Sequence, residues 1–264
     1  MVPETIFRPA VGRPLRGAGL EDIWTSEETP LTDDDGRARR ALVIAAHPDD
    51  ADFGAAGTAA LWSREGWEFY YLVCTDGSKG TDNLEVSPFE LIRIRREEQR
   101  EAARVAGVKE VFFLDNEDGE LQYTRDFLGQ VVRHIRMLKP DAVFTHDPTT
   151  LFHREQFINH PDHRCTGLVT VDAVYPTARD HLNFPTHAAE GLETHKVLEL
   201  YCWGSNEPNF DVDISEVLDV KFDALLSHRS QFGQREDFVK FATERWKDEE
   251  GRVLERFRRV TLFR

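Results

Sequence analysis

The stretch that decides the fold is residues 41–57, ALVIAAHPDDADFGAAG. It begins with an apolar, partly β-branched run at residues 42–46, which is typical of a strand buried on both faces of a parallel sheet. Polar residues follow abruptly, and small residues at 54–57 lead into a helical pattern. In open α/β sheets, ligands bind at the edge where strands give way to helices. The stretch therefore predicts an α/β fold with a functional site directly after this strand.

The polar residues of this stretch suit a metal. Imidazole and carboxylate groups are ordinary ligands of divalent transition metals, zinc above all. His47 and Asp50 are three residues apart, and a turn entering a helix brings both side chains to one side. Pro48 stiffens the approach, and Asp49 between the two is free to act as a base. Taken alone, the stretch leaves open a simpler interpretation, in which Asp49 or Asp50 caps the following helix.

A second cluster, Asn-His-Pro-Asp-His at residues 159–163, decides between these interpretations. It follows another strand candidate at residues 141–148, and His160 and His163 repeat the spacing of the first cluster. Two His-Pro-Asp clusters, each placed after a buried-looking strand, indicate one shared site rather than two helix caps.

The paired clusters resemble the PIG-L/LmbE superfamily of zinc-dependent N-deacetylases, and the resemblance extends over roughly residues 41–232. The family's first motif contains Ala-His-Pro-Asp-Asp and its second is His-Pro-Asp-His. The resemblance implies that His47, Asp50 and His163 are ligands of zinc, although another divalent metal is an alternative. It further implies that Asp49 is the general base.

The same resemblance assigns roles to the remaining residues of the second cluster. His160 matches the residue that stabilises the oxyanion or protonates the leaving group, and Asp162 matches the residue that orients it. The chain departs from the family at Asp52, where a Glu is usual. Asp is one carbon shorter, so the group that this Glu orients is expected to be held differently.

Three further residues match positions near the family's substrate. Arg95 belongs to an Arg-x-x-Glu-x-x-x-Ala-Ala pattern, Asp118 follows a strand candidate at 110–114, and His228 lies in a His-x-x-Gln motif. We expect all three to bind substrate. The alternatives are an ordinary surface ion pair for Arg95 with Glu98, and a packing role for His228.

Strand and helix candidates alternate along the chain, with strands at 68–74, 110–114, 141–148 and 196–203. This order predicts a Rossmann-like, mostly parallel sheet with helices on both faces. Residues 209–214 alternate as an edge strand does, and 259–263 suggest a closing strand. We expect one domain over residues 41–264, preceded by an extension at residues 1–40 that packs over the domain or helps assembly.

Composition restricts the partners. The chain has 264 residues and a net charge of −15, which argues against nucleic acid or an anionic membrane surface as a partner. Its three cysteines have no paired spacing, so neither a disulfide framework nor a thiolate metal site is expected. No apolar run has membrane-spanning length, and no signal-peptide pattern is present. We expect a cytoplasmic protein that acts on a small N-acetylated molecule, with homo-oligomer formation as a further expectation.

The predicted function is hydrolysis of an N-acyl group, most simply N-acetyl on an amino sugar, by water activated at the metal with Asp49 as base. A hydratase or amidase of the same superfamily, acting on a non-sugar substrate, is the alternative among enzymes. A non-catalytic metal-binding or sugar-binding module is the alternative from another class. The intact Asp49 argues against such a module, because a binder needs no base beside its metal.

Overall fold

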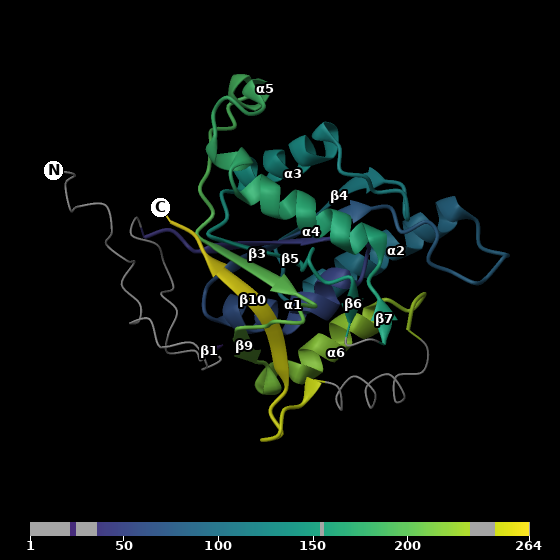
Figure 1. Ribbon diagram of the computed structural model, residues 1–264. Helices are drawn as coiled ribbons and strands as arrows, with labels where there is room; N and C mark the ends of the chain where they lie inside the picture. Colours follow the sequence, from purple (N-terminus) through teal and green to yellow (C-terminus); the bar gives the residue numbers. More distant parts are fainter. Residues whose placement is uncertain (1–21, 25–35, 154–155, 233–245, 264) are drawn as a thin grey trace.

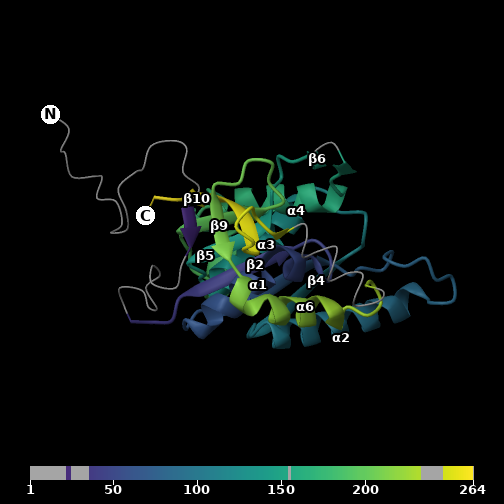
Figure 2. The same ribbon diagram turned by 90° about the horizontal axis from the view of Figure 1, so that it is seen from below.

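The computed structural model describes residues 22–24, 36–153, 156–232 and 246–263. Its centre is an eight-stranded sheet with the spatial order β1-β9-β10-β8-β5-β2-β3-β4. Helices cover both faces of this sheet (Figures 1 and 2). This architecture confirms the predicted α/β fold.

Five neighbouring strands make up the parallel part of the sheet. In chain order they are β2 (Arg40–Ala45), β3 (Glu68–Thr75), β4 (Glu110–Asn116), β5 (Ala142–His146) and β8 (Glu199–Trp203). The chain runs outward from β2 through β3 to β4, and then returns to the other side of β2 for β5 and β8. The direction of winding therefore reverses between β2 and β5, which is the place where open α/β sheets bind ligands.

The helices form one layer on each face of the sheet. They are α1 (Asp50–Arg64), α2 (Pro88–Val105), α3 (Arg125–Leu138), α4 (Pro161–Val174), α5 (Pro185–Ala189) and α6 (Leu218–Ser227). Figure 2 shows α1, α2 and α6 on one side of the strands and α3 and α4 on the other. Among the described residues, no helix is long and apolar enough to cross a bilayer.

Strand β2 shows how the sequence produces these layers. Alternate side chains of a strand point to opposite faces. Ala41, Val43 and Ala45 pack in a core with α1, whereas Leu42 and Ile44 pack in a second core with α3 and α4. All five side chains are fully buried. The apolar run therefore has no polar position, as expected for a strand covered on both sides.

Helix starts follow from local chemistry. Ser87 is the N-cap of α2 and accepts a hydrogen bond from the Glu90 N–H, with Pro88 at the first helical position. Thr124 caps α3 in the same way by accepting from the Phe127 N–H. These signals determine where α2 and α3 begin.

The far end of the sheet corrects two predictions. The short strand β9 (Phe210–Asp213) is not at the edge, because β1 (Asp22–Trp24) pairs with it in parallel. The last strand, β10 (Leu254–Thr261), is longer than expected and lies inside the sheet, antiparallel to both β8 and β9. The charged stretch from residue 236 is a further helix candidate in the sequence, and its residues 236–245 lie outside the described residues.

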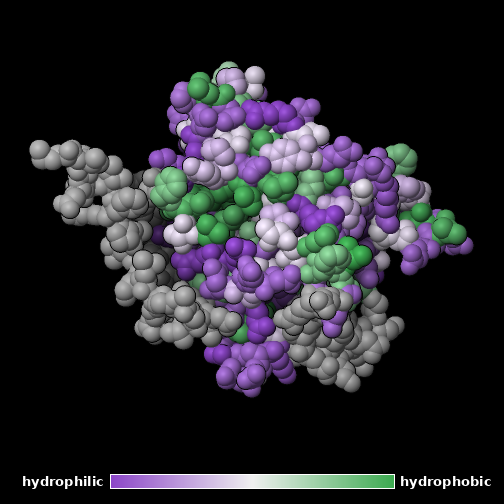
Figure 3. Space-filling model, viewed as in Figure 1, coloured by the Kyte–Doolittle hydropathy of each residue, from purple (hydrophilic) through white to green (hydrophobic). Residues whose placement is uncertain are grey.

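A small hairpin stands beside the carboxyl edge of the sheet. It consists of β6 (Phe152–His153) and β7 (Phe157–Ile158), between β5 and α4. Phe152, Phe157 and Ile158 are exposed. Figure 3 shows hydrophobic side chains gathered over this hairpin. The hairpin therefore adds an apolar surface close to the start of α4.

Candidate active site

The site begins where β2 ends. His47 follows the strand, and its Nδ1 lies 3.1 Å from Asp50 Oδ2 in the first turn of α1. The same carboxylate oxygen accepts the His47 backbone N–H at 2.8 Å. Both residues are buried. The turn entering α1 therefore brings His47 and Asp50 together, as their spacing predicts.

The second cluster arrives from α4. His160 is the N-cap of this helix, and His163 lies in its first turn. His163 Nε2 lies 3.2 Å from Asp50 Oδ1. Its other ring nitrogen, Nδ1, lies 3.2 Å from Asn159 Oδ1, a contact that sets the orientation of the ring. The His47 ring centre lies 4.7 Å from that of His160 and 5.2 Å from that of His163, so the two motifs share one pocket.

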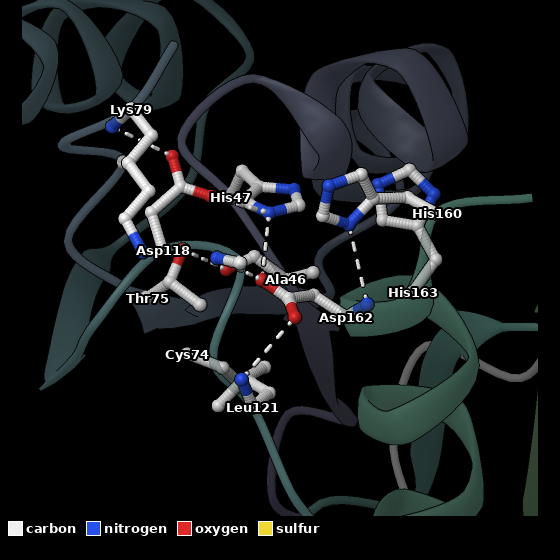
Figure 4. A network of polar contacts seen from close by, with 12 residues as sticks. Ala46, His47, Cys74, Thr75, Lys79, Asp118, Leu121, His160, Asp162 and His163 are labelled. Carbon is white, nitrogen blue, oxygen red and sulfur yellow. Dashed lines mark hydrogen bonds and ion pairs between the residues drawn. The ribbon is translucent and has the colours of Figure 1, made fainter.

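The other nitrogen of His47 faces two more carboxylates. His47 Nε2 lies 3.1 Å from Asp118 Oδ1 and 3.1 Å from Asp162 Oδ2 (Figure 4). Burial alone would lower the pKa of His47, but hydrogen bonds to Asp118, Asp162 and Asp50 raise it well above its usual value. The pKa of Asp118 falls to about 2 because bonding to His47 outweighs its own burial. The pocket thus concentrates negative charge around one imidazole and favours a positively charged occupant.

Three overlapping groups of side chains could each hold a metal ion. They are His47 with His160 and His163, Asp50 with His146 and His163, and His47 with Asp118 and Asp162. The predicted ligands His47, Asp50 and His163 span these groups. Asp50 contacts both histidines, on its two oxygens. Each predicted ligand belongs to at least one of these groups, but no single group contains all three, so their binding of one ion stays a prediction.

Asp49 lies beside this cluster. Its Oδ2 accepts a hydrogen bond from Arg95 Nη2 at 3.2 Å, and its backbone N–H donates to Gln99 Oε1 at 2.9 Å. Burial and the negative charge of Asp50 raise the pKa of Asp49 to about 6, although Arg95 opposes the shift. A carboxyl with this pKa is ionised at neutral pH and accepts a proton more readily than an ordinary Asp does.

Asp162 makes different contacts from those expected. Its carboxylate accepts hydrogen bonds from the Gly119 N–H at 2.7 Å and the Leu121 N–H at 3.2 Å, besides contacting His47. The backbone N–H of Asp162, not its carboxylate, donates a hydrogen bond to His160 Nδ1 at 3.2 Å (Figure 4). This donation places any proton of a neutral His160 on Nε2. Burial and the charge of His47 lower the pKa of His160, which favours that neutral form.

Two of the predicted substrate-binding residues are buried against the protein. Arg95 is 3% exposed, and its Nη1 donates to the Gly77 carbonyl at 3.0 Å. A Cβ at Gly77 or Gly80 would lie within 3 Å of Arg95 Nη1, so these glycines let the loop close around the guanidinium. His228 is fully buried, with Nε2 2.9 Å from Asp52 Oδ2. The contacts that the structure gives Arg95 and His228 are with protein groups, and binding of substrate by either stays a prediction.

The third residue of that set, Asp118, lies in the pocket itself. Besides contacting His47, its carboxylate accepts the Lys79 N–H at 3.0 Å. Asp52, which replaces the usual Glu, is not among the possible metal ligands. Its Oδ2 instead accepts a hydrogen bond from Gln99 Nε2 and lies 2.9 Å from His228 Nε2.

Sequence reasoning missed His146, the last residue of β5. Its ring stacks on that of His163 with centres 4.1 Å apart, and its Nε2 accepts the Ala46 N–H at 3.2 Å. Burial and the neighbouring His163 lower its pKa to about 4, so the ring is neutral at pH 7. The available signal was its position, since His146 ends the strand that pairs with β2 at the reversal of the sheet.

Solved structures share this fold. N,N'-diacetylchitobiose deacetylase from Pyrococcus horikoshii, complexed with an inhibitor, superposes with a TM-score of 0.77 at 32% identity, over 84% of both chains. The 4-carboxy-2-hydroxymuconate hydratase GalB from Pseudomonas putida superposes with a TM-score of 0.70 at 21% identity, over 85% of this chain and 97% of the other. At that identity the hydratase shows a common fold alone.

Sequence comparison agrees with the structural one. Diacetylchitobiose deacetylase of Thermococcus kodakarensis is 37% identical over 194 residues, which cover 74% of this chain and 70% of the relative. The model of the PIG-L family, described as GlcNAc-PI de-N-acetylase, matches residues 42–174, a span that contains both His-Pro-Asp clusters. The resemblance found in the sequence is thereby confirmed, and the chain belongs to the PIG-L family.

Proposed function

We propose that this protein is a metal-dependent hydrolase that removes the acetyl group from an N-acetylated amino sugar. The observation that carries the proposal is the contact of Asp50 with both His47 and His163, with Asp49 beside them. Two motifs from distant parts of the chain thus supply a possible metal site and an adjacent base in one pocket.

The residues fit a divalent ion such as zinc. Two imidazoles and one carboxylate are a common ligand set of catalytic zinc, and they leave coordination positions for water and substrate. His47, Asp50 and His163 would hold the ion. The buried carboxylates of Asp118 and Asp162 add negative charge around His47. When bound, zinc lowers the pKa of a coordinated water towards ~7 and polarises a carbonyl group.

In the proposed reaction, Asp49 accepts a proton from the attacking water on its carboxylate. Arg95 holds Asp49 Oδ2 at 3.2 Å and thereby directs the carboxylate. The raised pKa of Asp49, about 6, suits a base that works near neutral pH. General-base catalysis of this kind typically contributes about 10² to 10⁴-fold in rate.

His160 is the residue proposed to form a hydrogen bond with the reacting substrate. It is exposed, and its Nδ1 accepts a hydrogen bond from the Asp162 N–H. Its Nε2–H is therefore the group that donates a hydrogen bond to the developing oxyanion, and the proton that Asp49 takes from the attacking water is the one passed to the leaving amine. Asp162 orients this ring through its backbone and orients His47 through its carboxylate.

The names of the relatives support an amino-sugar substrate. Two of them, at 37% and 32% identity, are diacetylchitobiose deacetylases. The fold by itself does not choose the reaction, since the hydratase GalB shares it. The choice rests on Asp49 and on both His-Pro-Asp clusters.

The test is release of free amine and acetate from N-acetylglucosamine, diacetylchitobiose and other N-acetylated glycosides. We expect release by the metal-loaded enzyme, loss after dialysis against a chelator, and recovery on adding Zn²⁺ or another divalent ion. An unsaturated hydroxy-acid substrate and a non-sugar amide serve as comparison substrates. Turnover of either of these, with no amine released from any glycoside, would contradict the proposal in favour of the hydratase or amidase alternative.

A further inference from the structure

Side chains of α2 hold both ends of the peptide group that joins Pro48 to Asp49. Arg95 Nη2 donates to the Pro48 carbonyl oxygen at 2.7 Å, and the Asp49 N–H donates to Gln99 Oε1 at 2.9 Å. Arg95 and Gln99 are four residues apart and share one face of the helix. Because the C=O and N–H of a trans peptide point in opposite directions, the two side chains grip this peptide from both sides.

These two hydrogen bonds hold the peptide in an orientation that strains the backbone of Asp49. Its φ is 106° and its ψ is −32°, a backbone conformation that residues other than glycine rarely adopt. Turning the Pro48–Asp49 peptide by half a revolution would bring this φ into the right-handed helical range, where ψ already lies. Without the two hydrogen bonds, Asp49 would relax into an added helical residue at the start of α1.

The orientation of the Gln99 amide is itself determined. Gln99 Nε2 donates to Asp52 Oδ2 at 2.7 Å, and the same oxygen lies 2.9 Å from His228 Nε2. A carboxylate only accepts and a backbone N–H only donates, so the amide satisfies both neighbours in one orientation alone. Gln99, Asp52 and His228 are all fully buried. Water therefore does not substitute for a lost partner without rearrangement.

We propose that Gln99 is a positioning residue for Asp49: with Arg95 it clamps the Pro48–Asp49 peptide, and Asp52 keeps its amide in the productive orientation. The inference rests on the proposed role of Asp49 as general base. Arg95 Nη2 contacts the Pro48 carbonyl and Asp49 Oδ2 together. If the peptide turned, the guanidinium would lose the carbonyl and shift, and the base would shift with it.

The kinetic test compares Gln99→Met with Glu97→Met. Met keeps the length of the side chain but neither donates nor accepts at the amide positions. Glu97 is an exposed residue on the same helix that pairs with Arg93, so its variant controls for the replacement itself. We expect Gln99→Met to lower kcat between about 10-fold and 100-fold, with KM and bound metal unchanged. We expect the Glu97→Met enzyme to match the wild type.

A second variant covers the case in which Gln99→Met does not fold. Asp52→Asn keeps the shape at position 52, but its amide accepts or donates and no longer dictates the orientation of Gln99. We expect a loss of kcat of about 10-fold with metal retained. An unchanged kcat in either folded variant would contradict the positioning role of Gln99. A decrease in kcat that parallels a loss of bound metal would contradict it as well.

A crystal structure of either variant separates this inference from the proposed function, because it requires no substrate. In Gln99→Met we expect the Pro48–Asp49 peptide to be turned, with a negative φ at Asp49. In Asp52→Asn we expect Gln99 to lose its bond to the Asp49 N–H. If the backbone of Gln99→Met is unchanged, with a positive φ at Asp49, the proposed positioning role of Gln99 is contradicted even if no substrate is found. Wild-type inactivity on every N-acetylated glycoside would instead count against the proposed function.

Discussion

Asp50 Oδ1 lies 3.2 Å from His163 Nε2, so the two His-Pro-Asp clusters of the chain meet through one carboxylate. Asp50 also reaches His47 with its other oxygen, at 3.1 Å. This arrangement follows from the sheet: β2 and β5 are neighbours, and the chain leaves each of them at the same edge. With one oxygen close to each histidine, Asp50 suits the proposed role of metal ligand, whereas Asp49 next to it pairs with Arg95.

These different surroundings predict different outcomes for two adjacent substitutions. Asp49→Asn should keep the metal and lower the rate by about 10² to 10⁴-fold, because Asn keeps the shape but accepts no proton. Asp50→Ala should lose the metal as well, since it removes the carboxylate that contacts both histidines. The measurements are metal content by mass spectrometry and amine release. Full activity in Asp49→Asn, or metal retained only in Asp50→Ala, would show that the roles are assigned wrongly.

His146 should strengthen metal binding although no motif marks it. It stacks on His163 and accepts the Ala46 N–H, so it fixes both sides of the pocket. In His146→Phe we expect the ring packing to remain and the metal dissociation constant to rise between about 10-fold and 100-fold. His195→Phe is the matched control, because His195 bonds to Pro140 at the opposite end of β5. Equal affinities in the two variants, measured by competition with a chromogenic chelator, would contradict this role.

The contrast between the motif residues and His146 shows how far sequence reasoning reached. Residues 41–57 contain a whole strand, turn and helix start, so their local pattern determined β2, the turn and α1. The spacing within each cluster then identified the histidines and carboxylates of the pocket. His146 stands alone at the end of an apolar strand, and its role depends on the pairing of β5 with β2. Local periodicity carries no information about such a pairing.

The same limit explains the errors at the far side of the sheet. β9 was expected at an edge because its residues alternate, but β1, from a distant part of the chain, covers it. β10 lies between β8 and β9, so its length depends on two partners that local sequence does not reveal. Gln99 likewise lacks a distinguishing motif, and its importance follows only from its position opposite Asp49.

The buried pair of His228 and Asp52 predicts a pH-dependent stability. Burial lowers the pKa of His228, but its hydrogen bond to Asp52 outweighs burial and raises it. The folded protein therefore holds a proton that the unfolded chain releases near its ordinary pKa of about 6.5. Below that pH the stabilisation is complete, and it is lost as pH rises through the folded-state pKa.

Substituting His228→Asn should consequently destabilise the protein by about 3–5 kcal/mol at acidic pH, because a buried carboxylate loses its partner. The penalty should shrink as pH rises from about 6.5 through the raised folded-state pKa of His228, because the wild type then loses its own stabilisation. Urea unfolding across this range measures it. Asp52→Asn removes the other partner and should abolish the same pH dependence. A penalty that grows with pH would show that the pair does not hold the proton.

The close approach of α4 to β5 predicts that one methyl group is enough to disturb the site. A Cβ at Gly167 would lie 2.4 Å from the His146 carbonyl oxygen and 3.1 Å from Pro148 N, both of them backbone atoms that do not rotate away. Gly167 is one turn beyond His163 on the same helix. Moving α4 outward to admit the methyl group would therefore draw His163 away from Asp50.

We expect Gly167→Ala to destabilise the protein by about 1–3 kcal/mol through overpacking and to weaken metal binding together with activity. Gly129→Ala in α3 is the matched control on the same face of the sheet. Its Cβ would lie 2.8 Å from the Phe184 ring, which is the far end of a side chain and can rotate away. Ala also favours a helix over Gly by ~1 kcal/mol, which offsets that contact. Thermal unfolding and metal titration of both variants decide the matter: if Gly167→Ala binds metal as tightly as Gly129→Ala does, the distance between α4 and β5 does not set the geometry of the site.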